Sequence, residues 1–490
     1  MVVVFIVVFL IDKYKYKMIG RESQLALMHE TLSINKSCFV ALTGRRRVGK
    51  TYLINQVYKQ NMCLSVTGIQ NADTQIQINN FVQKISEHSI KRIKIKPKNW
   101  QDVFLLLKNY LKSLSKNKKQ VIFLDELPWI NTTKSGFIQL LAHLWNDYLS
   151  KEKHFVLVIC GSATSWITEK IINDKGGFYN RITHSIQLKP FTLAETKAFL
   201  NNKKITLSDS SIVELYLVMG GVPYYLENIK RGESPSKAIE RMCFSENGLL
   251  KNEYDNLYKA LFDYPENHEA IIASLAEAKS GLSREEIIKK SKVATGGPYT
   301  RAINELIVSG FIIEETPFGK LKRGSIYRLV DEFSVFYHKF IKKNKKANKG
   351  IWQLLATSQQ YKIWTGYAFE TLCIKHTDEI KKVLGIFNVY TQTSSYRHIS
   401  QNKIDGFQID LLIDRKDQAI NLCECKFYDA PFEINKSYAT QLKIRKSLFK
   451  QVTKTRKNIF TTLITNYPLK QNAHSIDSID VNLIISELMV

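Results

Sequence analysis

Residues 39–54 read FVALTGRRRVGKTYLI, an apolar run followed by a glycine loop and the start of a helical pattern. The loop has the spacing Gly44-x-x-x-x-Gly49-Lys50-Thr51, the P-loop pattern in its strand–loop–helix context. The two glycines let backbone N–H groups turn towards phosphate oxygens, and the helix start adds its positive dipole end. The stretch therefore predicts an α/β sheet with a phosphate cradle at a strand end.

Within this loop, side chain and backbone have different expected roles. Lys50 is expected to neutralise the β- and γ-phosphates of a nucleotide, and Thr51 to offer its hydroxyl to Mg²⁺. The residues expected to bind the nucleotide are Gly44, Arg45, Arg46, Arg47, Val48, Gly49, Lys50 and Thr51.

A second motif follows in QVIFLDELPWI (120–130), an apolar strand that ends in Asp125 and Glu126. A buried parallel strand is expected to be a continuous apolar run. Asp125 at its end can hold Mg²⁺ through water, and Glu126 is placed to polarise the attacking water. A capping acid after a core strand accounts for one carboxylate better than for two, so the pair favours hydrolysis over binding alone.

A third apolar strand, FVLVICGSATSWI (155–167), ends in small polar residues. Ser162 could sense the γ-phosphate from the neighbouring strand. It could equally cap the helix that follows the turn. The residues alone leave both interpretations open.

Six stretches in chain order resemble the archaeal-ATPase-like family of P-loop proteins, which is related to AAA+ and STAND ATPases. The resemblance covers roughly residues 18–260 and implies Mg-ATP binding with a helical lid after the core. It places Ile19 and Arg21 near the adenine, makes Arg181 a candidate arginine finger, and puts residues 220–223 in the lid. The stretches are MIGRESQLALMHETL, GRRRVGKTYLI, VIFLDELPWI, CGSATSWI, YNRITHSIQLKPF and MGGVPYYL.

Residues 265–330 read as three short helices and two strands, an arrangement that suggests a winged helix-turn-helix. Ser283 and Glu286 form a capping-box pattern. The third helix exposes one cation, Arg301, and one acid, Glu305, a poor set for reading bases. DNA contact and protein contact both remain open for this region. The wing offers cations that could contact phosphates, namely Lys320, Lys322, Arg323 and Arg328.

The stretch IDLLIDRKDQAINLCECKF (409–427) reads as two strands joined by a polar turn. Side chains alternate across a strand, so Asp410 is expected on one face with Leu412. Glu424 and Lys426 lie at the end of a second strand that looks buried on both faces. Because burying an ion costs several kcal/mol unless it is paired or binds metal, the two residues form either a structural ion pair or part of a metal site.

Together with Glu370 in the helical stretch YKIWTGYAFETLCIKH (361–376), this order resembles the PD-(D/E)XK nuclease core. The resemblance covers roughly residues 346–490. It implies that Asp410 and Glu424 ligate Mg²⁺, that Glu370 supports the metal, and that Lys426 orients or deprotonates the attacking water. The metal would stabilise charge that develops on the scissile phosphate.

The chain has 490 residues, 71 Lys+Arg against 45 Asp+Glu, and a net charge of +26. Such a balance favours a polyanionic partner, with nucleic acid and in particular DNA first, although a Lys-rich solvated surface explains it as well. Seven cysteines without metal-site spacing indicate reduced thiols and a cytoplasmic location. The N-terminal apolar run of 11 residues is too short to span a bilayer, so no stable membrane anchor is expected. Met18 could be the true first residue, which leaves residues 1–17 undecided.

The sequence thus predicts an α/β, multidomain protein. Its function is expected to be ATP binding and hydrolysis in an action on nucleic acid, with Mg²⁺-dependent endonuclease activity in the last domain. The alternative is a STAND-like regulatory ATPase switch with an inactive C-terminal binding module. Expected partners are DNA and, in a homo-oligomer, further copies of the chain. The expected domains are a P-loop ATPase core (18–180), a helical lid (181–262), a winged helix-turn-helix with linker (263–345) and a PD-(D/E)XK-like domain (346–490).

Overall fold

The computed structural model describes residues 18–89, 97–262, 264–320, 324–346, 349–400 and 405–489. It divides into two compact units, with the boundary between Lys189 and Pro190. The N-terminal apolar run and the wing cations Lys322 and Arg323 lie outside the described residues. Among the described residues, no helix is long and apolar enough to cross a membrane. All seven cysteines are buried and free, as the sequence predicted.

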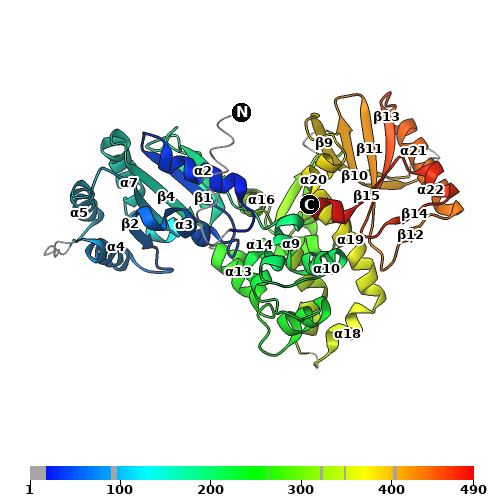
Figure 1. Cartoon of the computed structure of the whole chain (residues 1–490), viewed down its shortest axis with the longest axis horizontal. Helices are drawn as coiled ribbons and strands as arrows, with labels where there is room; N and C mark the ends of the chain where they lie inside the picture. Colours follow the sequence, from blue (N-terminus) through cyan, green and yellow to red (C-terminus); the bar gives the residue numbers. More distant parts are fainter. Residues whose placement is uncertain are drawn as a thin grey trace. The chain divides into compact units, whose positions relative to one another are not determined.

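The first unit is built on a five-stranded parallel sheet (Figure 1). Its strand order is β2-β3-β4-β1-β5, so β4 lies between β1 and β3. Every residue of these three strands is buried, as expected for the centre of a parallel sheet. The parallel α/β core predicted from the P-loop stretch is therefore confirmed. The strands are β1 (Cys38–Thr43), β2 (Met62–Thr67), β3 (Gln120–Asp125), β4 (Phe155–Gly161) and β5 (His184–Gln187).

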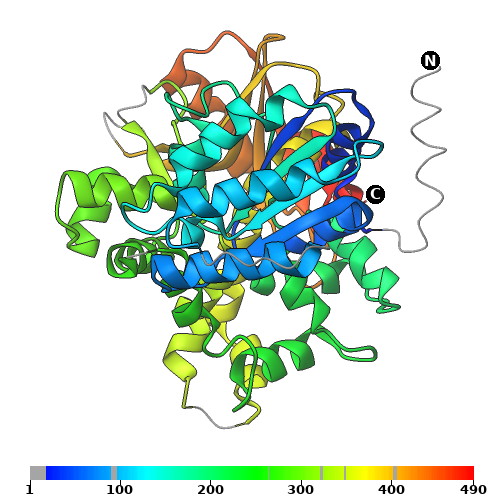
Figure 2. The same cartoon turned by 90° about the vertical axis from the view of Figure 1, so that its left-hand side faces the viewer.

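Alternating side chains of the sheet feed two separate apolar cores. Val40 and Leu42 of β1 pack with Leu53 of α3 on one face, whereas Phe39 packs with Trp145 of α7 on the other. The first unit therefore has three layers, with helices on both faces of the sheet. Blue and cyan helices of this unit face the viewer in Figure 2. Helices α2 (Glu22–Ser33) and α3 (Lys50–Tyr58) cover the first face, and α4 (Thr74–His88), α5 (Trp100–Lys112) and α7 (Phe137–Asp147) cover the second.

The sheet runs past the residue at which the sequence placed the end of the ATPase core. That boundary was set at residue 180, but β5 pairs with β1 through Leu42 and Ile186. The sequence pattern for β5 is weak, because only one of its four residues is buried and the strand therefore has no continuous apolar run.

The second unit begins with helices that belong to the region predicted as a lid. Phe191 donates its backbone N–H to the carbonyl oxygen of Gly221 at 2.6 Å. A Cβ atom at Gly221 would lie 1.9 Å from the carbonyl oxygen of Phe191, so only glycine fits this close approach. The helices are α9 (Leu193–Asn202), α10 (Asp209–Met219), α11 (Pro223–Glu227), α12 (Pro235–Ile239) and α13 (Glu253–Leu261).

Five α-helices, α14 to α18, and a small antiparallel sheet of order β6-β8-β7 follow among the described residues. Ser283 and Glu286 form the capping box that the sequence predicted at the start of α15. Ala302 and Leu306 of α16 are buried. The elements are α14 (Pro265–Glu277), β6 (Leu282–Ser283), α15 (Arg284–Ser291), α16 (Gly297–Val308), β7 (Ile312–Glu315), β8 (Ile326–Leu329), α17 (Glu332–Phe336) and α18 (Ile351–Ala356).

The C-terminal part of the second unit has a mixed sheet of order β15-β13-β11-β10-β9. Strands β9, β10 and β11 are antiparallel neighbours, and β11, β13 and β15 run parallel. A separate short pair joins β12 to β14. The elements are α19 (Gln359–Lys375), α20 (Thr377–Val383), β9 (Thr391–His398), β10 (Phe407–Arg415), β11 (Ala419–Lys426), β12 (Phe432–Glu433), α21 (Lys436–Thr453), β13 (Asn458–Thr465), β14 (Leu469–Lys470), α22 (Ala473–Ser478) and β15 (Val481–Ile484).

A buried histidine ties the first helices of this unit to its C-terminal part. His376 is 3% exposed, and its Nε2 accepts a hydrogen bond from the backbone N–H of Leu193 at 3.2 Å. Its Nδ1 lies 2.9 Å from the carbonyl oxygen of Leu372 and can donate to it. Burial lowers the pKa of His376 to about 4, which keeps the ring neutral and able to accept from Leu193 at ordinary pH.

The close approach at Gly221 gives a stability prediction for the second unit. Gly221→Ala should lower the free energy of unfolding by about 3 kcal/mol or more, because backbone atoms must move to admit the methyl group. Gly366→Ala in α19 is the matched control, since a Cβ there meets nothing within 4 Å. That change should raise stability by about 0.5–1 kcal/mol. Chemical denaturation of both variants measures the difference, and equal midpoints would contradict the assignment.

Candidate functional site

The loop of residues 44–51 positions Lys50 as the first residue of α3. Lys50 is buried, and its Nζ donates to the carbonyl oxygens of Gly44 at 2.7 Å and Arg45 at 3.0 Å, and to Ser162 Oγ at 3.0 Å. Gly44 has φ +142°, and a Cβ there would lie 2.4 Å from the carbonyl oxygen of Leu188. Glycine at this position is therefore a steric requirement of the loop.

Thr51 and Asp125 meet across the ends of α3 and β3. The Thr51 hydroxyl donates to Asp125 Oδ2 at 3.0 Å. Burial raises the pKa of Asp125, and the nearby charge of Glu126 raises it further. A hydroxyl and a carboxylate oxygen are the hard donors that Mg²⁺ prefers, so this pair fits the ion that the sequence predicted.

Glu126 has a left-handed backbone, with φ 46° and ψ 51°. Such a conformation is unfavourable for a non-glycine residue and is found most often at functional sites. Its carboxylate accepts from the backbone N–H of Ser162 at 3.0 Å and from the Ser162 hydroxyl at 2.7 Å. Ser162 therefore bridges Lys50 and Glu126, the two charged residues expected to act on the nucleotide.

The cap interpretation of Ser162 is not what the structure shows. The residue that precedes helix α8 (Thr164–Ile167) is Ala163, without a side-chain cap. Ser162 instead follows β4, and because β4 lies between β1 and β3, its side chain reaches both Lys50 and Glu126.

The other residues predicted for the nucleotide lie in different surroundings. Arg21 and Arg45 are buried, and Ile19 is half-buried. Arg21 precedes α2, where its carbonyl oxygen accepts from the backbone N–H of Leu25. Arg181 is exposed in a turn before β5. The half-buried Arg46 and Arg47 and the buried Val48 complete the loop.

In the C-terminal sheet, an irregularity in β10 places Asp410. The pairing of β10 with β9 shifts between Ile409 and Leu412, and these two residues pack in the same apolar cluster. Simple alternation would put Ile409 and Leu412 on opposite faces, so the register shift is a local departure from alternation. Bulges of this kind re-aim side chains beside functional sites. Asp410 Oδ2 accepts from the backbone N–H of Cys425 at 3.0 Å.

Glu424 is the centre of a buried ionic network. Its Oε1 accepts from Lys426 Nζ at 2.7 Å and from the Tyr438 hydroxyl at 2.8 Å. Its Oε2 accepts from Arg445 at 2.8 Å. The sequence interpretation missed Tyr438 and Arg445. They lie seven positions apart on α21 and therefore on one helix face, a pattern that could have suggested a shared partner.

The three predicted carboxylates have different electrostatic surroundings. Burial works against the charge of Glu424, but Lys426 and Arg445 outweigh it and hold its pKa below the usual range. Burial, followed by the charge of Glu424, raises the pKa of Asp410 to about 6. Burial, followed by the charge of Asp410, raises the pKa of Glu370 to about 8. Like charges that lie close together disfavour each other's ionisation, which adds to the effect of burial at Asp410 and Glu370.

One wing cation has a different role from the one predicted. Arg328 in β8 is 4% exposed and pairs with buried Glu315 of β7 at 3.3 Å. It is therefore not available to DNA phosphates, and that prediction was wrong. Glu315 also accepts from the Ser395 hydroxyl at 2.9 Å, which connects the small sheet to β9.

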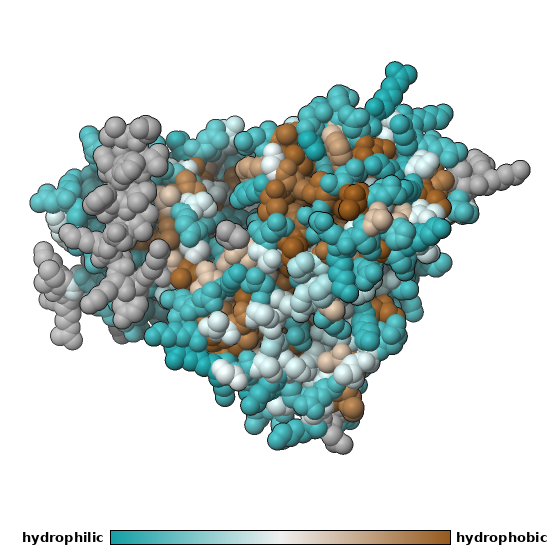
Figure 3. Space-filling model, turned by 45° about the vertical axis from the view of Figure 1, so that its right-hand side comes forward, coloured by the Kyte–Doolittle hydropathy of each residue, from teal (hydrophilic) through white to brown (hydrophobic). Residues whose placement is uncertain are grey.

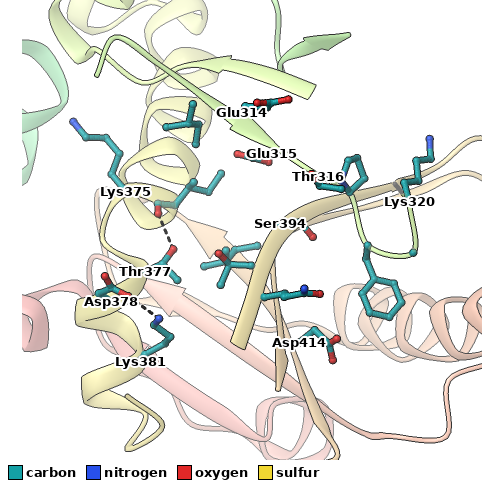
Figure 4. Close-up of a pocket in the computed structure, with 18 residues that line it drawn as sticks. Glu314, Glu315, Thr316, Lys320, Lys375, Thr377, Asp378, Lys381, Ser394 and Asp414 are labelled. Carbon is teal, nitrogen blue, oxygen red and sulfur yellow. Dashed lines mark hydrogen bonds and ion pairs between the residues drawn. The ribbon is translucent and has the colours of Figure 1, made fainter. Parts of the chain in front are cut away.

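Glu315 also borders a cleft of about 820 Å³, shown in Figure 4. The labelled side chains come from β7 and the loop after it, from α19 and α20, and from β9 and β10. Lys381 pairs with Asp378 at 2.6 Å, and Lys375 pairs with Glu332. None of the predicted catalytic or metal residues lines this cleft, so the candidate site lies elsewhere.

Comparison with known proteins identifies the class of the first unit. Residues 18–229 match the family model described as an ATPase domain predominantly from Archaea. An uncharacterized protein of Methanocaldococcus jannaschii is 26% identical over 418 residues, which covers 84% of this chain and 88% of the relative. An uncharacterized ATP-binding protein of the same organism is 30% identical over 243 residues, 48% of this chain and 64% of the relative. The chain therefore carries an ATPase domain, and the enzyme class predicted from the P-loop and Asp125–Glu126 is confirmed.

Among solved structures, a Walker-type ATPase of Pyrococcus abyssi is similar to this chain. It is 18% identical with a TM-score of 0.49, and the match covers 66% of this chain and 96% of that one.

Variants of the P-loop site should separate nucleotide binding from hydrolysis. Lys50→Ala should weaken ATP binding by about 10-fold to 100-fold, because a hydrogen bond to a charged group contributes ~1.5–3 kcal/mol. Glu126→Gln should keep ATP binding and lose turnover, because an amide cannot polarise water. Lys59→Ala, at an exposed position just after α3, is the control and should change neither. Nucleotide titration and phosphate release measure the two properties, and equal turnover in wild type and Glu126→Gln would exclude that role.

Proposed function

We propose that this chain is a Mg²⁺-dependent ATPase that acts on DNA through a C-terminal PD-(D/E)XK nuclease domain. The observation that carries the proposal is geometric: Asp410 accepts from the backbone N–H of Cys425 at 3.0 Å, next to Glu424, whose carboxylate pairs with Lys426 at 2.7 Å. Burial, followed by the charge of Asp410, raises the pKa of Glu370, the third carboxylate of the group. The three carboxylates come from α19, a bulged β10 and β11 of a mixed sheet. The helices of residues 181–262 then serve as a lid, residues 263–345 as a winged helix-turn-helix, and residues 346–490 as the nuclease domain.

In the ATPase unit, the proposed cycle begins when a nucleotide phosphate competes with the present protein partners of Lys50. The ammonium is satisfied by Gly44, Arg45 and Ser162, all of which an incoming phosphate must replace in part. Loss of the Lys50 contact loosens Ser162, which also holds Glu126. Phosphate binding is thereby linked to the release of Glu126 towards the attacking water. Thr51 and Asp125 would hold Mg²⁺, which shields the phosphate charge when bound.

The remaining nucleotide roles rest on the family resemblance. Ile19 and Arg21 would lie beside the adenine, and Ser162 would respond to the γ-phosphate. Arg181 would act as an arginine finger. Because Arg181 is exposed, this role suits delivery into the site of another copy in a homo-oligomer.

In the nuclease domain, Asp410 and Glu424 offer the hard oxygen donors that Mg²⁺ requires. The charge of Glu424 helps raise the pKa of Asp410, and a cation shared by both would relieve this repulsion. Glu370 would support the ion. Burial works against the charge of Lys426, but Glu424 and Asp410 outweigh it and raise the pKa of the ammonium, so Lys426 would leave Glu424 to orient the attacking water. The ion would stabilise charge on the scissile phosphate.

A second candidate function is a STAND-like regulatory switch whose C-terminal fold binds without cleaving. A specific observation favours it: both oxygens of Glu424 already accept from Lys426, Tyr438 and Arg445. Within the described parts of the chain, no group of three His, Cys, Asp or Glu residues is arranged to hold a metal. In an inactive domain, a buried carboxylate such as Glu424 is expected to be fully paired with cations and donors of the protein itself.

DNA as the partner is supported by charge. The chain carries a net charge of +26. Figure 3 shows many hydrophilic residues on the face in view, interrupted by hydrophobic ones. Lys320 of the wing is exposed. Arg301 of α16 is exposed but pairs with Glu305 at 3.0 Å, so this helix offers little for reading bases. Binding should therefore depend on phosphate contacts and fall steeply as salt rises.

Plasmid nicking and thermal melting, each with and without Mn²⁺, test the two candidates. We expect wild type to nick DNA and to melt higher with Mn²⁺, because the ion binds the folded state. Asp410→Asn and Glu424→Gln should lose both effects, because each removes a proposed ligand. Lys426→Ala should lose nicking yet keep the Mn²⁺ shift, because an ammonium is not a ligand. Asp417→Asn, at an exposed acid in the turn after β10, is the control and should behave as wild type.

The switch hypothesis predicts a different pattern. Wild type would not nick and would not respond to Mn²⁺. Lys426→Ala would melt far lower, since loss of one partner of a buried ion pair costs on the order of 3–5 kcal/mol. That combination would withdraw the nuclease proposal and leave the ATPase unit unaffected.

A further inference from the structure

Three aromatic rings lie beside the Glu424 network. Tyr428 stacks on Phe432 with ring centroids 4.7 Å apart and an interplanar angle of 18°. Phe432 meets Tyr438 edge to face at 5.6 Å. Tyr438 donates its hydroxyl to Glu424, and Lys426 Nζ lies 5.8 Å from the centre of the Tyr438 ring. The ring series therefore runs from the proposed catalytic residues outwards to Tyr428.

The outer ring is exposed although its backbone is fixed. Tyr428 is 44% exposed, a large fraction for an aromatic side chain held in a stack. Its backbone N–H donates to Asn466 Oδ1 at 2.8 Å, and its carbonyl oxygen accepts from Asn466 Nδ2 at 2.7 Å. Asn466 is itself 6% exposed. The buried side-chain amide of Asn466 thus binds both backbone polar groups of Tyr428. The Tyr428 ring therefore projects from a fixed backbone position.

Phe432 is held in the same way by the short sheet. It lies in β12, which pairs in parallel with β14 through Phe432 and Leu469. We call Tyr428 and Phe432 the aromatic platform. A preorganised ring of this kind offers contact area with little further loss of side-chain entropy on binding.

The charged residues beside the aromatic platform include acids, which makes the platform itself unsuited to binding phosphate. Asp429 follows Tyr428 and is exposed, and Glu433 pairs with Lys470 at 3.4 Å. Lys426 and Arg445 lie on the inner side, where both contact Glu424. Phosphates are therefore favoured on the inner side, and a neutral, flat group suits the ring itself.

We infer that the aromatic platform stacks against an unpaired nucleobase next to the phosphate bound by the candidate nuclease site, so that the preferred substrate is single-stranded DNA. The inference rests on the proposed action on DNA and adds the substrate class. Bases inside a duplex have both faces covered by their neighbours, whereas unstacked bases stack readily on aromatic side chains. Stacking is tolerant of sequence, so the platform selects strand state and not base identity.

Binding of fluorescent oligonucleotides in EDTA tests this without requiring cleavage. Wild type should bind a single strand more tightly than the matching duplex. Tyr428→Ala should weaken single-strand binding between about 5-fold and 150-fold, the range for loss of one base stack. Tyr428→Phe keeps the ring and should bind as wild type, whereas Tyr428→Leu keeps apolar bulk and should bind as weakly as Tyr428→Ala. Tyr390→Ala removes another exposed ring of the same unit, 64% exposed, and should have no effect.

The salt dependence gives a second readout that a merely structural role would not reproduce. Tyr428→Ala should lower affinity at every salt concentration and leave the slope of log K against log salt unchanged, because no phosphate contact is removed. A 2-aminopurine in the single strand should be quenched by wild type and not by Tyr428→Leu.

The outcomes separate this inference from the proposed function. If wild type binds neither single-stranded nor duplex DNA, the proposed function is wrong, and so is the inference that the platform stacks against a nucleobase. If wild type binds both forms equally and Tyr428→Ala changes nothing, only the platform is wrong and action on DNA stands.

Discussion

A buried charge must have partners, and both charged centres of the chain are built around that constraint. Lys50 is 6% exposed and finds three oxygens within 3.0 Å, two of them backbone carbonyls of its own loop. Glu424 is equally buried and finds two cations and a hydroxyl. In each case the charged group already has partners within the protein. A ligand therefore binds by exchange of existing contacts.

Ser162 is one of the contacts of Lys50 that a ligand would replace, and it is also a partner of Glu126. Because β4 lies between β1 and β3, the residue that follows it reaches Lys50 of the P-loop on one side and the carboxylate of Glu126 on the other. The strand order of the sheet thus creates a short polar relay. Lys50 and Glu126 are thus connected through one hydroxyl, that of Ser162.

Local patterns predicted the parts of the site that depend on neighbouring residues in the chain. The glycine spacing around Lys50, the Asp125–Glu126 pair after an apolar strand, and the capping box at Ser283 all follow from short-range geometry. Contacts between distant segments were not predictable in this way. Arg445 reaches Glu424 from α21, and Arg328 turns to a partner across a strand pair. Their burial, and so their role as internal partners, depends on tertiary packing that a single sequence does not encode locally.

The pairing of Glu315 with Arg328 and Ser395 joins two sheets of the second unit. Glu315 and Arg328 belong to the small antiparallel sheet, whereas Ser395 belongs to the large mixed sheet. A chain cut between these two sheets would leave the buried carboxylate without one of its donors. The two sheets are therefore expected to unfold together as one cooperative piece.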